Sequence, residues 1–147
     1  MVEPGLRSTR RYALDVLTLT VDVRDRMVAH CLSALPLEGC GLLLGSDGDS
    51  VVDVVGTPNA ADSAVLYEVD AKDHLAVDRG ARERGLEVVG AFHSHTHTDA
   101  WPSPTDVATA VDPGWHWVVI SLRHFEPVVR SFRIVDGNVD QEPVALA

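Results

Sequence analysis

Residues 87–92, Glu-Val-Val-Gly-Ala-Phe, are apolar on both alternating faces of a β-strand. A strand with this pattern is typical of the buried interior of a sheet, where neither face contacts water. The strand runs directly into a polar segment with histidines at positions 93, 95 and 97. The sequence therefore predicts a buried strand whose end carries polar, chemically active side chains.

Short segments with strand or helix periodicity alternate along the rest of the chain. Strands are predicted over residues 12–20, 40–44, 51–55, 65–69, 115–122, 128–135 and 139–144. Helices are predicted over residues 23–35, capped by Asp22, over residues 71–84, capped by Asp70, and over residues 103–111. Several neighbouring strands are joined by turns rather than helices. This order indicates a mixed sheet flanked by helices in one α/β domain.

The chain has 147 residues, which suits one domain over residues 13–147 after a flexible tail at 1–12. It holds 22 acidic and 12 basic residues, a net charge of −10, so it lacks the cations that nucleic-acid binding requires. We expect no membrane span and no signal peptide, and therefore a cytoplasmic protein. Two cysteines, Cys31 and Cys40, are too few for a disulfide framework.

His93 and His95 lie two residues apart at the end of the predicted strand, where alternate side chains point to the same side. Asp106 lies in the first turn of the following helix and can supply a carboxylate oxygen to the same ion. Two histidines and one carboxylate leave a fourth tetrahedral position for water, which is typical of a catalytic zinc site. We therefore predict one Zn²⁺ per chain, bound by His93, His95 and Asp106.

Hydrolysis at such a site also needs a general base and a donor to the oxyanion. Glu38 stands directly before an apolar strand predicted in the same sheet, where it is available as base and proton shuttle. Ser103 precedes the helix that carries Asp106, so its hydroxyl can donate to the developing oxyanion. Glu38 and Ser103 are the predicted catalytic residues.

Each of these residues also has a purely structural interpretation. Ser103 and Asp106 fit a helix capping box, in which an acidic residue follows the capping serine by three positions. His93 and His95 could be polar residues at a strand end, and Glu38 a solvated loop residue. Capping and metal ligation are compatible, and the combined pattern favours the metal site.

The combined pattern resembles the JAMM motif of the MPN+ zinc metalloprotease family. The matching residues are Glu38, His93-Ser94-His95 and, after seven further residues, Ser103-Pro104-Thr105-Asp106. The resemblance covers most of the chain. It implies a single MPN domain with a mixed sheet flanked by helices, layered like cytidine deaminases. It also implies the ligand, base and oxyanion roles given above.

Within that family, the chain is similar to the Mec-type sulfur-carrier-protein-cysteine peptidases of actinobacteria. The similarity rests on residues 93–96, Trp101-Pro102-Ser103, residues 130–137 and Glu142-Pro143. It implies a ubiquitin-like sulfur carrier with a Gly-Gly tail as substrate, from which cysteine or residues after Gly-Gly are released. Thr96 replaces the proline of many family members, and the adjacent His97 is expected to be solvated.

The sequence thus predicts a zinc metallopeptidase that hydrolyses a C-terminal peptide bond of a small ubiquitin-like sulfur carrier. One alternative is a JAMM-type hydrolase of another peptide or isopeptide. Another is a non-catalytic MPN scaffold, although such relatives characteristically lack the metal ligands that are present here. The sequence indicates no oligomeric state.

Overall fold

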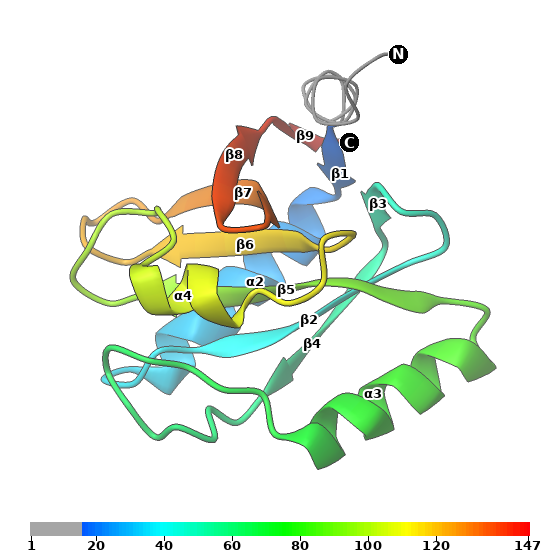
Figure 1. Cartoon of the computed structure of the whole chain (residues 1–147), viewed down its shortest axis with the longest axis horizontal. Coiled ribbons are helices and arrows are strands. Elements are labelled where there is room, and N and C mark those ends of the chain that lie inside the picture. Colours follow the sequence, from blue (N-terminus) through cyan, green and yellow to red (C-terminus); the bar gives the residue numbers. More distant parts are fainter. Residues whose placement is uncertain (1–15) are drawn as a thin grey trace.

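The computed structural model describes residues 16–147, whose strands form two sheets. The larger sheet has six strands in the order β4-β2-β5-β6-β7-β8 (Figure 1). These strands are Cys40–Gly45 (β2), Asp53–Thr57 (β4), Glu87–His95 (β5), His116–Ser121 (β6), Val128–Val135 (β7) and Asn138–Glu142 (β8). Within this sheet β5 and β6 are parallel and the other pairs are antiparallel. The predicted mixed sheet is confirmed.

The smaller sheet joins segments that are distant in the sequence. Leu17–Leu19 (β1) pairs in parallel with Ser50–Val51 (β3) on one side and Val144–Leu146 (β9) on the other. The predicted strand over 12–20 is therefore shorter within the described residues, and residues 12–15 and the predicted tail over 1–12 lie outside them. Pro143 divides the predicted strand over 139–144 into β8 and β9, because proline lacks the N–H that a ladder needs.

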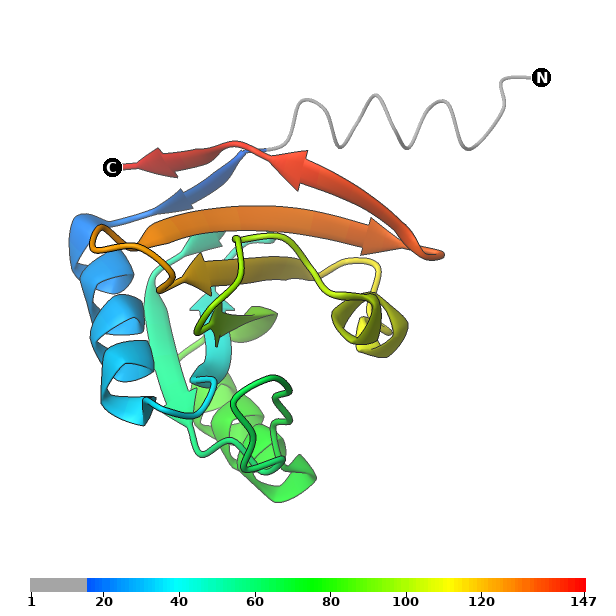
Figure 2. The same cartoon turned by 90° about the vertical axis from the view of Figure 1, so that its left-hand side faces the viewer.

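Three helices flank the larger sheet within the described residues: Val21–Ala34 (α2), Ala71–Glu83 (α3) and Pro104–Thr109 (α4). Helix α2 lies on one side of the sheet and α4 on the other (Figure 2). Among the described helices, none combines the length and apolar composition required to cross a membrane. The predicted three helices are confirmed, although α4 ends two residues before the expected boundary.

Helix α2 begins earlier than predicted, and Asp22 is not its capping residue. Thr20 is the N-cap, because its hydroxyl accepts a hydrogen bond from the backbone N–H of Val23 at 3.1 Å. Asp22 lies instead in the first turn, where its carboxylate pairs with Arg26 four residues later at 3.0 Å. Both residue types can cap a helix, so the choice between them depends on where the preceding strand ends.

Apolar residues on the two faces of the sheet form separate cores. On one face, α2 and β1 cover a cluster that includes Met27, Phe92 and Val118. On the other face, α3 and α4 supply Val77 and Val107 to a second cluster. Residues 91, 93 and 95 of β5 share this second face by strand alternation. The second core therefore lies directly beside the two histidines.

The predicted strand over residues 65–69 is wrong. These residues form an irregular loop, in which the side chains of Val65 and Leu66 are exposed rather than buried in a sheet. The backbone groups of Leu66 and Glu68 bond to the side chain of Asn59 instead of to a neighbouring strand. Asp70 then caps α3 as predicted, its carboxylate accepting a hydrogen bond from the N–H of Lys72 at 2.8 Å.

Candidate metal centre

His93 and His95 lie at the C-terminal end of β5, with their rings on the same face of the sheet. Their side chains are buried, and their Nε2 atoms lie 3.2 Å apart. The Nδ1 of His95 donates to the backbone carbonyl of Asp99 at 2.9 Å. With Nδ1 protonated, the Nε2 of a neutral His95 ring presents its lone pair toward His93.

Asp106 completes the group from the first turn of α4. Its Oδ2 lies 3.0 Å from the Nε2 of His93 and 3.0 Å from the Nε2 of His95. The capping box of α4 fixes this carboxylate: the Ser103 hydroxyl accepts from the Asp106 N–H at 3.0 Å, and Asp106 Oδ2 accepts from the Ser103 N–H at 2.9 Å. The structure thus brings the three predicted ligands together, and capping coexists with this arrangement.

The electrostatics of the group suit a cation. Burial alone would raise the pKa of Asp106, but hydrogen bonds from His93, His95 and the Ser103 backbone outweigh it and hold that pKa far below the ordinary range. Burial lowers the pKa of His93 despite the neighbouring Asp106. An ionised carboxylate beside a neutral imidazole is the ligand state that a metal ion requires. His93, His95 and Asp106 therefore form a candidate metal-binding group.

Glu38 lies next to this group and is only 4% exposed. Cys40 at the start of β2 pairs with His93, so the same antiparallel register brings Glu38 toward His95. Burial raises the pKa of Glu38 to about 7, although the charge of His95 opposes the rise. Its Oε1 is buried without a hydrogen-bond partner among the described residues. A carboxyl group in this state can accept a proton near neutral pH.

The backbone beside Glu38 is held tightly against β5 and α2. The N–H of Gly39 donates to the hydroxyl of Ser94 at 2.8 Å, and the N–H of Ser94 donates back to the Gly39 carbonyl at 3.0 Å. A Cβ atom at residue 39 would lie 2.7 Å from the Cα of Cys31, so only glycine permits this approach. Ser94 therefore fixes the backbone next to Glu38 against β5.

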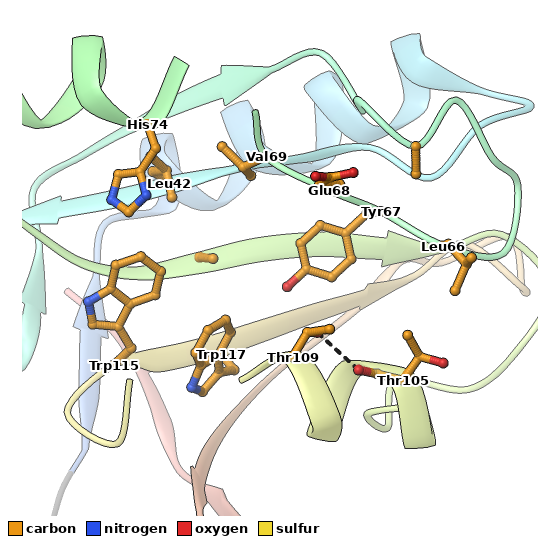
Figure 3. A pocket seen from close by; sticks show the side chains of 12 residues that line it. Leu42, Leu66, Tyr67, Glu68, Val69, His74, Thr105, Thr109, Trp115 and Trp117 are labelled. Atoms are coloured by element: carbon orange, nitrogen blue, oxygen red, sulfur yellow. Dashed lines mark hydrogen bonds between the residues drawn. The ribbon is translucent and has the colours of Figure 1, made fainter. Parts of the chain in front are cut away.

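Tyr67 also belongs to the site, which the predicted strand over residues 65–69 did not indicate. Its ring stacks on the His93 ring with centroids 4.1 Å apart and an interplanar angle of 13°. Burial raises the pKa of Tyr67 well above its ordinary value, so its hydroxyl stays neutral. Figure 3 shows this hydroxyl pointing toward Trp117 and away from the loop that carries it. The one sequence signal for Tyr67 was an aromatic residue in a segment, residues 65–69, where apolar and polar residues alternate only weakly.

A pocket of about 390 Å³ extends from Tyr67 along the same face of the sheet. Trp115 and Trp117 share this face as their alternation predicts, with ring centroids 5.3 Å apart. Thr105 and Thr109 of α4 line the pocket on the same side as Trp117, across from the loop that carries Tyr67 (Figure 3). Most of the lining is apolar, and its other members include Leu42, Leu66, Val69, His74 and Ala91. The pocket is therefore suited to an apolar side chain.

His97 does not join the metal-binding group. Its side chain is exposed, and its Nδ1 lies 2.8 Å from the hydroxyl of Thr96. The hydroxyl of Thr96 in turn donates to the Ala64 carbonyl at 3.2 Å, which ties the segment after β5 to the loop that carries Tyr67. The solvated state expected for His97 agrees with its exposure.

Comparison with known proteins gives consistent relatives. A peptidase of Mycobacterium tuberculosis named CysO-cysteine peptidase is 39% identical over 137 residues, which covers 92% of this chain and 94% of the relative. A desampylase of Haloferax volcanii is 33% identical over 111 residues, covering 71% of this chain and 80% of the relative.

Solved structures support the same fold. A protein from Desulfitobacterium hafniense superposes with a TM-score of 0.80 at 37% identity, covering 89% of this chain and 92% of that one. A JAB1/MPN domain protein from Archaeoglobus fulgidus superposes with a TM-score of 0.58 at 18% identity, covering 90% and 99%. Residues 20–135 match the family described as prokaryotic homologs of the JAB domain. The chain therefore belongs to this JAB/MPN family, and its relatives show that it is of a peptidase type.

Proposed function

We propose that this protein is a zinc-dependent metallopeptidase that cleaves a C-terminal peptide bond of a small ubiquitin-like sulfur carrier. The observation that carries the proposal is the convergence of His93, His95 and Asp106 beside the buried carboxyl group of Glu38. The relative named CysO-cysteine peptidase supports the release of cysteine, and the relative named desampylase supports a protein-conjugate substrate.

The donor set favours zinc. The three ligand atoms lie 3.0–3.2 Å from one another. Ligands on a tetrahedron around zinc, with bonds of about 2.0–2.1 Å, lie about 3.3 Å apart. Two imidazoles and one carboxylate also match the composition of catalytic zinc sites with an open position. The three side chains need only small adjustments to hold the ion.

Zinc bound by these residues would supply Lewis-acid activation of water and of the scissile carbonyl. Glu38, buried beside the metal-binding group, then accepts the proton of the attacking water and returns it to the leaving amine. The hydroxyl oxygen of Ser103 accepts from the Asp106 N–H, which leaves its own hydrogen able to stabilise the oxyanion.

The substrate is proposed to lie with its C-terminal tail extended beside the metal-binding group. Ala91, which lines the pocket, is two residues before His93 on β5, a separation of about 7 Å along the strand. An extended tail that reaches the metal would therefore pass the pocket bounded by Tyr67, Trp115 and Trp117. A Gly-Gly end would pass the narrow space beside Tyr67, and an earlier apolar side chain would enter the pocket.

The proposal is tested by incubating the protein with small ubiquitin-fold carriers that end in Gly-Gly-Cys, followed by intact-mass measurement of the carrier. We expect the loss of one cysteine and about one zinc ion per chain in protein purified without added metal. Glu38→Gln should retain zinc and lose turnover by about 10²–10⁴-fold, while Asp106→Ala should lose both.

Two variants on the surface serve as controls. Glu83→Gln and Asp140→Ala alter exposed acidic residues of α3 and β8 and should retain both zinc and turnover. Undiminished turnover in Glu38→Gln would show that Glu38 is not the base. Zinc-free protein with the ligands intact would instead favour a scaffold role.

A further inference from the structure

The loop over residues 58–70 contains no strand or helix, yet one side chain organises most of its backbone. The Nδ2 of Asn59 donates to the carbonyls of Glu38 at 3.0 Å, Ser63 at 3.2 Å and Leu66 at 2.8 Å. Its Oδ1 accepts from the N–H groups of Ala61 and Glu68, both at 3.0 Å. Asn59 therefore replaces the hydrogen bonds that a regular ladder would supply.

These five partners determine the orientation of the Asn59 amide. Three carbonyl oxygens surround Nδ2 and two N–H groups surround Oδ1, so the reversed amide would face repulsion at every contact. Aspartate has the same shape but offers no donor. No other natural side chain of this size provides both halves of the arrangement.

The partners of Asn59 belong to two separate parts of the site. One is the carbonyl of Glu38, whose own N–H donates to the Ser63 carbonyl at 2.9 Å, so both backbone groups of the base depend on this loop. Two others, Leu66 and Glu68, flank Tyr67 in sequence. Tyr67 in turn stacks on His93. One amide thus holds the base and the aromatic wall in a fixed relation.

We propose that Asn59 is a positioning residue that sets the carboxyl group of Glu38 for proton transfer and holds Tyr67 against His93. This inference rests on the proposed function, because it takes Glu38 as the base. Asn59 bonds to the backbone of Glu38 and to the backbone of the two residues that flank Tyr67. It therefore acts through Glu38, which lies beside the metal-binding group, and through Tyr67, which stacks on His93. Such supporting hydrogen bonds are commonly worth about 10–100-fold in activity.

The test compares Asn59→Asp with the parent protein and repeats the comparison in a Glu38→Gln background. Each rate is measured under single-turnover conditions, with zinc-loaded protein and a carrier that ends in Gly-Gly-Cys. In the parent background we expect a turnover loss of about 10–100-fold together with a higher KM. In the Glu38→Gln background the same substitution should change turnover less than about threefold, because the residue through which Asn59 acts is already disabled.

The control is Asn138→Asp, which makes the same change at the other asparagine of the chain, exposed at the start of β8. It should leave turnover and KM unchanged. If Asn59→Asp does not fold, as judged by circular dichroism, Asn59→Ser retains one donor and one acceptor without added charge and carries the same comparison.

Equal losses in the two backgrounds would show that Asn59 acts only through general stability, and an unchanged rate in Asn59→Asp would show that it positions nothing. Either result overturns the inference while leaving the proposed function intact, provided that Glu38→Gln alone reduces turnover by about 10²–10⁴-fold. A fully active Glu38→Gln overturns both, and so identifies the proposed function as the failure.

Discussion

Glu38, the proposed base, places an ionisable carboxyl group among buried side chains two residues before β2, where its ionisation opposes folding. Burial raises the pKa of Glu38 to about 7 from an ordinary value near 4.5. In the unfolded chain the group ionises freely, whereas the folded protein resists its ionisation. The metal-free fold therefore becomes less stable as the pH rises above about 4.5, and the full cost is present above about 7.

Glu38→Gln should consequently stabilise the metal-free protein. The difference between pKa values of about 4.5 and about 7 corresponds to up to about 3 kcal/mol, at about 1.4 kcal/mol per pKa unit. Thermal unfolding with a chelator present should show no gain at pH 4 and a growing gain from pH 5 to pH 8. Glu83→Gln, at an exposed position, should show none. A gain that does not change with pH would contradict the assignment of the cost to ionisation.

At the level of elements, α4 is a six-residue helix whose first turn carries Asp106, the proposed third metal ligand. A helix this short is marginal on its own, so its capping box and its packing must stabilise it. Ser103 has two separable contributions: its oxygen accepts the Asp106 N–H at 3.0 Å, and its hydrogen is available to a substrate. Asparagine preserves the cap but lacks the hydroxyl group.

Ser103→Asn should therefore retain the melting temperature and the zinc content while reducing kcat by about 10²–10³-fold. Ser103→Thr, which keeps the hydroxyl, should stay close to the parent protein in all three measurements. Ser103→Ala should lose kcat and, in addition, about 1 kcal/mol of stability through the missing cap. Near-normal kcat in Ser103→Asn would mean that the serine only caps the helix.

At the scale of the whole molecule, a buried polar cluster joins the start of β6, the end away from His93 and His95, to β7 and β8. His116 is fully buried, with its Nδ1 2.6 Å from Oε2 of Glu142 and its Nε2 within hydrogen-bond distance of the Gly48 carbonyl. The hydroxyl of Ser131 donates to Glu142 Oε2 at 2.7 Å, and Arg133 Nε lies 3.3 Å from Oε1. This cluster links three strands and the turn after β2.

The charge state of the cluster makes part of the fold stability depend on pH. Burial alone would raise the pKa of Glu142, but the hydrogen bonds from His116 and Ser131 and the charge of Arg133 outweigh it and lower that pKa below 4.5. A lowered carboxyl pKa stabilises the fold above the unfolded value near 4.5, and this contribution disappears as the pH falls through the folded value.

Glu142→Gln should destabilise the protein by about 3–5 kcal/mol at pH 7, because it removes the acidic partner of a buried ion pair with Arg133. The deficit should stay constant between pH 7 and pH 5 and become smaller below about 4.5, as measured by urea unfolding at each pH. Glu126→Gln, at an exposed position between β6 and β7, is the matched control. A deficit that persists unchanged at low pH would indicate a packing defect instead of a lost charge interaction.

Patterns within a few residues predicted much of this molecule. The apolar character of residues 87–92 on both faces predicted a buried strand, and the spacing of His93 and His95 predicted that both rings share a face. Asp70 as a cap and Gly85, with φ of +71°, as the end of α3 follow from local backbone preferences. Two predictions were wrong: Asp22 as the N-cap of α2, a position that Thr20 occupies, and a strand over residues 65–69, which form a loop. In both places the local sequence is compatible with either structure.

The sequence by itself predicted that His93, His95 and Asp106 come together, because a two-residue spacing on a strand and a capping box on a helix fix side-chain directions without knowledge of the fold. Only the tertiary structure decided the contacts across 26 residues between His116 and Glu142, and across 21 residues between Asn59 and Glu38. It also decided that Tyr67 covers His93. Such pairs depend on strand order and on loop paths, and these leave no period in the sequence.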